Sequence, residues 1–163
     1  MLKYLYCKEV FSEVPDEICL ALSISNCQIK CHGCNQKELW EDNGTVLDST
    51  ILNTLLRNHR GITCVLFMGG DSNPSEIDAL AQFIKIYYPL KVAWYSGRQE
   101  LSKDINLKWF DYIKLGPYIE ELGPLNSKTT NQKMYEVVYS HYEDGTAEYE
   151  LNDITYKFHG KKD

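Results

Sequence analysis

Two short runs of the sequence, residues 18–24 and 62–67, are apolar on both alternating faces. This pattern is typical of strands that are covered on both sides, as in parallel sheets. Between the two runs, Leu52, Leu55 and Leu56 recur at helical spacing, and Asp48 or Ser49 offers a side-chain oxygen for an N-cap. The sequence therefore predicts a strand, a crossover helix and a second, parallel strand.

The same rhythm continues after the second run. Asn73 suits an N-cap, Pro74 suits the first helical position, and Glu76 suits the third, so a second helix is predicted to begin here and to end before Pro89. Two further strands and a short helix between them are predicted at residues 91–95, 112–115 and 98–103, respectively. The alternation implies an α/β fold with right-handed crossovers.

Beyond residue 115 the pattern changes. Residues 116–131 are rich in Gly-Pro pairs and short polar side chains, which predicts a long loop with a functional role. The last segment alternates around residues 143–146, so residues 135–142 and 147–158 are predicted to pair as a C-terminal β-hairpin. At 163 residues, we expect one domain over residues 1–163.

The composition restricts the partners. A net charge of -6 and a pI near 5.2 argue against a surface that follows nucleic-acid phosphates. No apolar run is long enough to span a bilayer, and the first residues lack the pattern of a signal peptide. We therefore expect a soluble, cytoplasmic protein with no nucleic-acid or membrane partner.

The six cysteines are unevenly distributed, because Cys27, Cys31 and Cys34 lie within eight residues. Thiolates select zinc, copper(I) or iron-sulfur clusters. A structural zinc site needs four ligands, and the second half of such a site is absent. A cubane cluster held by three thiolates leaves one iron open to a small molecule. The remaining cysteines are interpreted as structural. In the alternative, Cys7, Cys19 or Cys64 closes the site of a non-catalytic iron-sulfur or zinc module.

The predicted strand order brings candidate ligands together. Cys27 follows the first predicted strand, and Gly69, Gly70 and Asp71 follow the second, so both segments should lie at the carboxyl edge of the sheet. Glycines at that edge allow a close backbone approach, and a carboxylate suits an ammonium group. Lys114 is interpreted as a solvated lysine at a strand end, and a charge near a bound carboxylate is the alternative. Trp40 is open to two interpretations, a lid on the core or an interface residue.

These motifs carry a family resemblance. The C-x3-C-x2-C run with a Gly-Gly-Asp loop resembles the radical S-adenosylmethionine enzymes. The subgroup is indicated by further matching segments: Cys27 to Cys34 with Trp40, Met68 to Asp71, Tyr95 to Gly97, Gly116 to Leu122, and Asn131 with Gln132. Together these segments are similar to the activating proteins of anaerobic ribonucleoside-triphosphate reductase. The resemblance implies a partial, laterally open (β/α) barrel of parallel strands, followed by the C-terminal hairpin.

The resemblance also implies roles for particular residues. Cys27, Cys31 and Cys34 would ligate a [4Fe-4S] cluster whose fourth iron takes S-adenosylmethionine. The remaining contacts with that cofactor are the methionyl ammonium at Gly69, Gly70 and Asp71, the nucleoside along Gly33, Cys34 and Asn35, and a second polar contact from Ser96.

The implied activity is that of a radical S-adenosylmethionine oxidoreductase, which places a glycyl radical on the large subunit of the reductase. A flavodoxin or ferredoxin would supply one electron. An activase of another glycyl-radical enzyme, such as pyruvate formate-lyase, is the nearest alternative. The loop over residues 116–131 is predicted to dock the partner, with Tyr118, Glu120 and Glu121 as candidate contacts.

Overall fold

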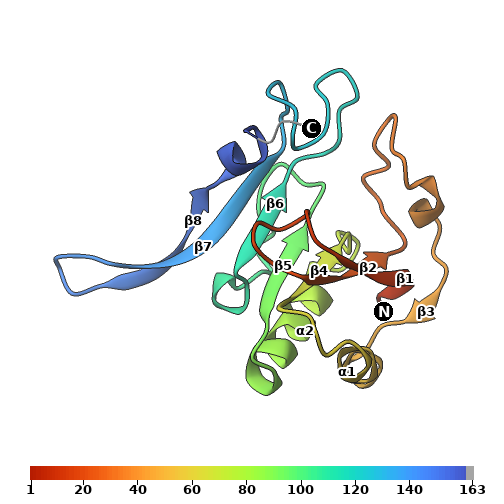
Figure 1. Cartoon of the computed structure of the whole chain (residues 1–163), viewed down its shortest axis with the longest axis horizontal. Helices are drawn as coiled ribbons and strands as arrows, with labels where there is room; N and C mark the ends of the chain where they lie inside the picture. Colours follow the sequence, from red (N-terminus) through yellow and green to blue (C-terminus); the bar gives the residue numbers. More distant parts are fainter. Residues whose placement is uncertain (161–163) are drawn as a thin grey trace.

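A computed structural model, which describes residues 1–160, shows one mixed eight-stranded sheet with two α-helices on it (Figure 1). The order across the sheet is β3-β1-β2-β4-β5-β6-β7-β8. The strands are β1 Lys3–Val10, β2 Cys19–Ile24, β3 Thr45–Val46, β4 Cys64–Met68, β5 Lys91–Tyr95, β6 Tyr112–Leu115, β7 Lys133–His141 and β8 Ala147–Asp153. The helices are α1 Ser49–Asn58 and α2 Pro74–Tyr87, and three 3-10 turns span Lys37–Trp40, Leu107–Trp109 and Thr155–Phe158.

The centre of the sheet is parallel, as predicted. The four central strands, β2, β4, β5 and β6, pair in this order and run parallel to one another. In the register, Cys19 of β2 pairs with Cys64 of β4, which in turn pairs with Lys91 of β5. All four strands lie within one or two residues of their predicted positions. Because parallel neighbours share a direction, their carboxyl ends meet at one edge, where the cysteine-bearing loop begins.

Both predicted helix starts are confirmed. The Asp48 carboxylate accepts a hydrogen bond from the Ile51 amide at 2.8 Å, and the Asn73 side chain accepts one from the Glu76 amide at 3.3 Å. Each bond satisfies an amide that the first turn of a helix leaves without a partner. The second helix ends at Tyr87, before Pro89, as expected.

The two faces of the sheet are covered differently. On one face α1 and α2 pack against the central strands, with Leu52 and Ile77 fully buried beside Phe67 and Trp94. On the other face the cover comes from the chain ends. Its buried residues include Val10 at the end of β1 and Val14 after it, and Met134, Ile154 and Phe158 from the C-terminal region.

Several expectations are wrong or not confirmed. The partial barrel is not confirmed, because the sheet is open, with β3 and β8 at its edges, and antiparallel pairs extend it on both sides. Strands β1 and β3 were not predicted. Residues 98–103 form no helix, and the 3-10 turn at Leu107–Trp109 takes its place. The hairpin is confirmed, although its last residues, Thr155–Phe158, form a 3-10 turn.

In the part of the chain that the structure describes, neither helix has the length and apolarity needed to cross a membrane.

Candidate metal centre

The cysteine triplet lies in a loop that leaves the carboxyl end of β2. Three residues of this loop adopt left-handed backbone conformations, Asn26 with φ 60°, Lys30 with φ 47° and Gly33 with φ 78°. The ends of the loop are tied together, because the Cys27 amide donates to the Leu39 carbonyl at 2.8 Å. The chain therefore curls tightly enough to direct residues from both halves of the loop to one place.

The three cysteines line one cavity of about 190 Å³ at the edge of the parallel strands. A second cavity of about 830 Å³ adjoins it, and the two share seven lining residues. These are Cys34, Gln36, Met68, Tyr95, Lys114, Tyr118 and Gln132. The cysteines thus face a space large enough for a molecule beyond the metal itself.

Backbone amides point at two of the sulfurs. The Tyr118 amide donates to Cys31 Sγ at 3.3 Å, and the Gln36 amide donates to Cys34 Sγ at the same distance. Burial raises the pKa of the Cys31 thiol, and the neighbouring Cys27 and Cys34 add to the rise, whereas the Tyr118 amide opposes it. Amide hydrogen bonds to cysteine sulfur stabilise negative charge and tune the potential of an iron-sulfur cluster.

The donor set suits a cluster. Within residues 1–160, no three His, Cys, Asp or Glu side chains converge closely enough to hold a single metal ion. In a cubane cluster each thiolate binds a different iron, so the three cysteine sulfurs lie further apart than they do around a single metal ion. Trp40 lines the same cavity, and its buried Nε1 has no hydrogen-bond partner.

The other three cysteines lie elsewhere. Cys19 and Cys64 are fully buried side by side at the first residues of β2 and β4, the end of the sheet opposite the cysteine loop. Cys7 lies in the middle of β1, opposite Leu22. Their interpretation as structural residues agrees with these positions, and none of them extends the triplet to four.

Asp71 has an internal role that the sequence did not indicate. Its carboxylate is 4% exposed and accepts hydrogen bonds from the Ser96 hydroxyl at 2.6 Å and the Gly97 amide at 2.8 Å. The Arg98 guanidinium lies 3.4 Å away. The two predicted ligand residues, Asp71 and Ser96, therefore contact each other and join the ends of β4 and β5. Direct contact of either one with a substrate stays a prediction.

The two glycines before Asp71 are also engaged. The Gly69 carbonyl accepts a hydrogen bond from Trp94 Nε1 at 2.7 Å. Gly70 has φ 93°, and a Cβ added there would lie 2.6 Å from Cδ1 of Ile77 in α2. Glycine at position 70 is therefore required by the backbone conformation of the turn and by the packing of α2, independently of any ligand.

Lys114 is not a solvated strand-end residue. It lies within the sheet, between Tyr95 and Met134, and lines both cavities. Its Nζ lies 4.8 Å from the centre of the Tyr95 ring. Burial lowers the pKa of Lys114 to about 8, against the opposing influence of Cys31 and Asp71. The strand pattern missed this ammonium group because it cannot show which side chain at a sheet edge turns inward.

The loop after β6 forms a wall of the site. Tyr118 contributes the amide to Cys31, and a Cβ added at Gly33 would lie 2.8 Å from Glu120 Oε2. Glu120 and Glu121 are both exposed, and within residues 1–160 no contact of Glu121 with the cysteine loop is observed. Two of the three predicted docking contacts therefore lie against the cysteine loop. Of the predicted nucleoside residues, Asn35 lines the larger cavity together with Cys34.

Contacts between loops hold this arrangement together. Gly97, which follows β5, leaves room for Ile29 of the cysteine loop, since a Cβ there would lie 2.8 Å from Ile29 Cγ1. Ile29, Lys114 and the Tyr118 amide are functional-site residues that sequence reasoning missed. A contact between two loops that are distant in the chain cannot be recognised from a single sequence.

The soft donors, the amides directed at sulfur and the cavity define an iron-sulfur protein. The comparison with protein families agrees, since the profile described as "4Fe-4S single cluster domain" matches residues 18–138. The match covers most of the chain, including the triplet and strands β2 to β6, and the protein belongs to this family. Comparison with curated proteins and with solved structures gives no significant match.

Proposed function

We propose that this protein is a radical S-adenosylmethionine activase, which generates a glycyl radical on anaerobic ribonucleoside-triphosphate reductase. The observation that carries the proposal is the cavity at the carboxyl edge of the parallel strands, which three cysteines line and which opens into a larger space. The other three cysteines lie in the strands, away from the triplet. That arrangement supports a cluster with one iron left for a small molecule.

Cys27, Cys31 and Cys34 would hold the cluster. When bound, the cluster would supply the single electron for reductive cleavage of S-adenosylmethionine, the chemistry needed for hydrogen abstraction from a glycine of the partner. The residues of this chain would bind and orient the cluster and S-adenosylmethionine. The amides of Gln36 and Tyr118 donate to Cys34 and Cys31 and would stabilise thiolate charge, and Trp40 lines the cavity wall.

The rest of the binding pocket follows from what lines the cavities. Met68 and Gly69 at the end of β4, with Ser96 and Gly97 at the end of β5, form the side that would receive the methionyl group. Asn35 and Gln36 line the adjoining space and would receive the nucleoside. Asp71 shapes this side by fixing Ser96 and Gly97, in addition to its predicted contact with the ammonium group.

The lateral opening of the sheet supports a protein substrate. The larger cavity is bordered by the loop after β6 and by Phe158 of the C-terminal turn, and no covering domain is present within residues 1–160. A glycine on a protein loop can enter such a cleft, whereas a small substrate would be poorly protected from water.

The test is anaerobic reconstitution with iron and sulfide, followed by electron paramagnetic resonance. Addition of S-adenosylmethionine to the reduced protein should change the cluster spectrum, and addition of the reductase from the same source should yield a stable glycyl radical. An unchanged spectrum would support a non-catalytic iron-sulfur module. A radical on pyruvate formate-lyase and none on the reductase would identify a different partner.

A further inference from the structure

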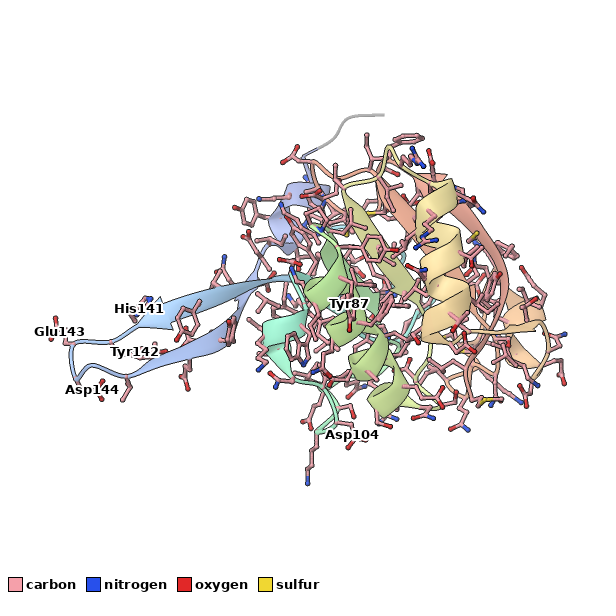
Figure 2. All side chains as sticks on the ribbon, turned by 90° about the horizontal axis from the view of Figure 1, so that it is seen from below. Tyr87, Asp104, His141, Tyr142, Glu143 and Asp144 are labelled. Atoms are coloured by element: carbon pink, nitrogen blue, oxygen red, sulfur yellow. The ribbon has the colours of Figure 1, made fainter. Side chains whose placement is uncertain are left out.

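The β7–β8 hairpin extends well beyond the rest of the molecule (Figures 1 and 2). β6 pairs with β7 only at Lys133 to Glu136, whereas β7 and β8 pair with each other as far as His141 and Ala147. Tyr135, Val137 and Leu151 still pack against the core. The outer part, residues 138–150, is here called the arm. Its residues are exposed or half-buried, and none of them is fully buried.

The register gives the arm two different faces. Tyr139 lies opposite Tyr149 with ring centres 4.6 Å apart, and His141 meets the Tyr139 ring edge-on at 4.9 Å. Tyr139 is 53% exposed and Tyr149 is 43% exposed. The opposite face carries Glu148 and Glu150. Aromatic rings that face solvent together in a projecting ribbon favour a contact surface.

The charge of the chain is concentrated in this hairpin. Residues 134–153 carry six of the 23 acidic residues and no Lys or Arg, and the remaining 17 acidic residues are matched by 17 Lys and Arg. The whole hairpin from Lys133 to Asp153 therefore has a net charge of -5, against -6 for the full chain. The six carboxylates are Glu136, Glu143, Asp144, Glu148, Glu150 and Asp153. Glu143 and Asp144 lie at the tip (Figure 2).

The charge and the exposed tyrosines of the arm indicate what kind of partner it binds. The exposed tyrosine rings on one face of the arm suit stacking by Arg side chains, and the carboxylates on the other face and at the tip suit pairing with Arg and Lys. A second copy of the chain would bring like charges together, and nucleic acid or an anionic membrane would be repelled. The surface thus fits a positively charged patch on another protein.

The arm is continuous with the cleft. Gln132, the residue before β7, lines both cavities, and Phe158, shortly after β8, lines the larger one. A nine-residue strand such as β7 is roughly 30 Å long, so an occupant that reaches from the cleft to the tip must be a macromolecule.

We infer that the arm is a docking element for a basic surface of the protein substrate whose glycine enters the cleft. This inference rests on the proposed function for the identity of the substrate, whereas the chemistry of the arm stands on its own residues. The arm attracts the partner by charge and holds it alongside the sheet, while the cleft receives the reacting loop.

The test compares two double variants of equal net charge. Glu143→Gln with Glu148→Gln removes two exposed carboxylates from the hairpin, and Glu100→Gln with Asp104→Asn removes two exposed carboxylates from the loop after β5. Affinity for the reductase is measured by surface-immobilised binding at low and high salt. The hairpin variant should bind about tenfold more weakly at low salt and lose much of its salt dependence, whereas the loop variant should behave as wild type.

Two further measurements separate the possible failures. Cleavage of S-adenosylmethionine without the reductase should be equal in both variants, and the glycyl radical yield at saturating reductase judges the proposed function by itself. Equal binding of the two variants would overturn the arm as a docking element even if the radical forms. Binding that depends on the hairpin, with no radical, would overturn the function and leave the docking intact. No binding by the wild type, or self-association that the hairpin variant abolishes, would also overturn the inference.

Discussion

The parallel centre of the sheet and its antiparallel margins differ in how they are buried and in what they carry. β2 and β4 in the centre are covered on both faces, and the turns at their carboxyl ends bear the cysteines and the glycines. β8 at the margin is never fully buried, and the hairpin that it forms with β7 extends into solvent. In the centre, stability and chemistry depend on the same residues. At the margin, side chains are free to serve recognition at little cost in stability.

Removal of a cluster ligand should have the largest effect and tests whether the chemistry belongs to the centre. Cys31→Ser removes a sulfur that accepts the Tyr118 amide and lies between the two other thiols. We expect the reconstituted variant to lose nearly all of its bound iron, since an oxygen ligand replaces a soft thiolate. Iron and sulfide analysis measures the loss.

The matched control is Cys7→Ser on the marginal strand β1, which should keep a normal iron content. If Cys7→Ser lost the cluster and Cys31→Ser kept it, the ligand set would be wrong and the comparison between centre and margin would fail.

Asp71→Asn should give the next largest effect, because this one carboxylate joins the ends of two central strands. The amide NH₂ would face either the Ser96 hydroxyl or the Gly97 amide, which are both donors to the native carboxylate. We expect the free energy of unfolding to fall by about 2–4 kcal/mol, as for a buried ionic group that loses its partners. Denaturant unfolding of the cluster-free protein measures it.

Asp104→Asn is the control, since Asp104 is exposed in the loop after β5 (Figure 2), and its effect should stay within about 0.5 kcal/mol. Unchanged stability in Asp71→Asn combined with lost S-adenosylmethionine binding would assign Asp71 to the ligand alone.

Gly97→Ala should have an intermediate effect and tests how the centre holds the cysteine loop. The new Cβ would lie 2.8 Å from Ile29 Cγ1, so the Ile29 side chain must move. We expect a loss of about 1–2 kcal/mol and a lower cluster content. At Gly61 nothing lies within 4 Å, and Gly61→Ala should leave both quantities unchanged. Equal results for the two variants would show that Ile29 does not anchor the loop.

The sequence predicted most of the centre and little of the margins, for a physical reason. Strands buried on both faces, such as β2 and β4, leave continuous apolar runs, and the N-caps Asp48 and Asn73 use local hydrogen bonds. β1 mixes Tyr and Lys with apolar residues because it is only partly buried, so its pattern is weak. The open edges of the sheet depend on tertiary pairing, which local patterns do not contain.

The candidate site was predictable to a similar extent. The cysteine spacing indicated three candidate ligands, and the parallel order predicted that the Gly69 turn would lie beside them; the cysteines and Gly69 line one cavity. The inward side chain of Lys114 and the Tyr118 amide at Cys31 could not be predicted, because both depend on how the loop after β6 folds back. The profile match extends only to residue 138, so most of the β7–β8 hairpin lies outside it.

Substitution of one tyrosine of the exposed pair in the hairpin should have the smallest effect on stability. Tyr149→Ala removes one ring of the Tyr139–Tyr149 pair, whose side chains are both exposed. A cross-strand pair of this kind contributes roughly 0.2–1 kcal/mol, so the free energy of unfolding should fall by less than about 1 kcal/mol. Leu151→Ala, two residues further along β8, should cost more because Leu151 packs against the core. Denaturant unfolding of both variants gives the two values on one scale. If Tyr149→Ala were as costly as Leu151→Ala, the hairpin would be part of the folded core along its whole length, and its tyrosines would stabilise the fold instead of remaining available to a partner.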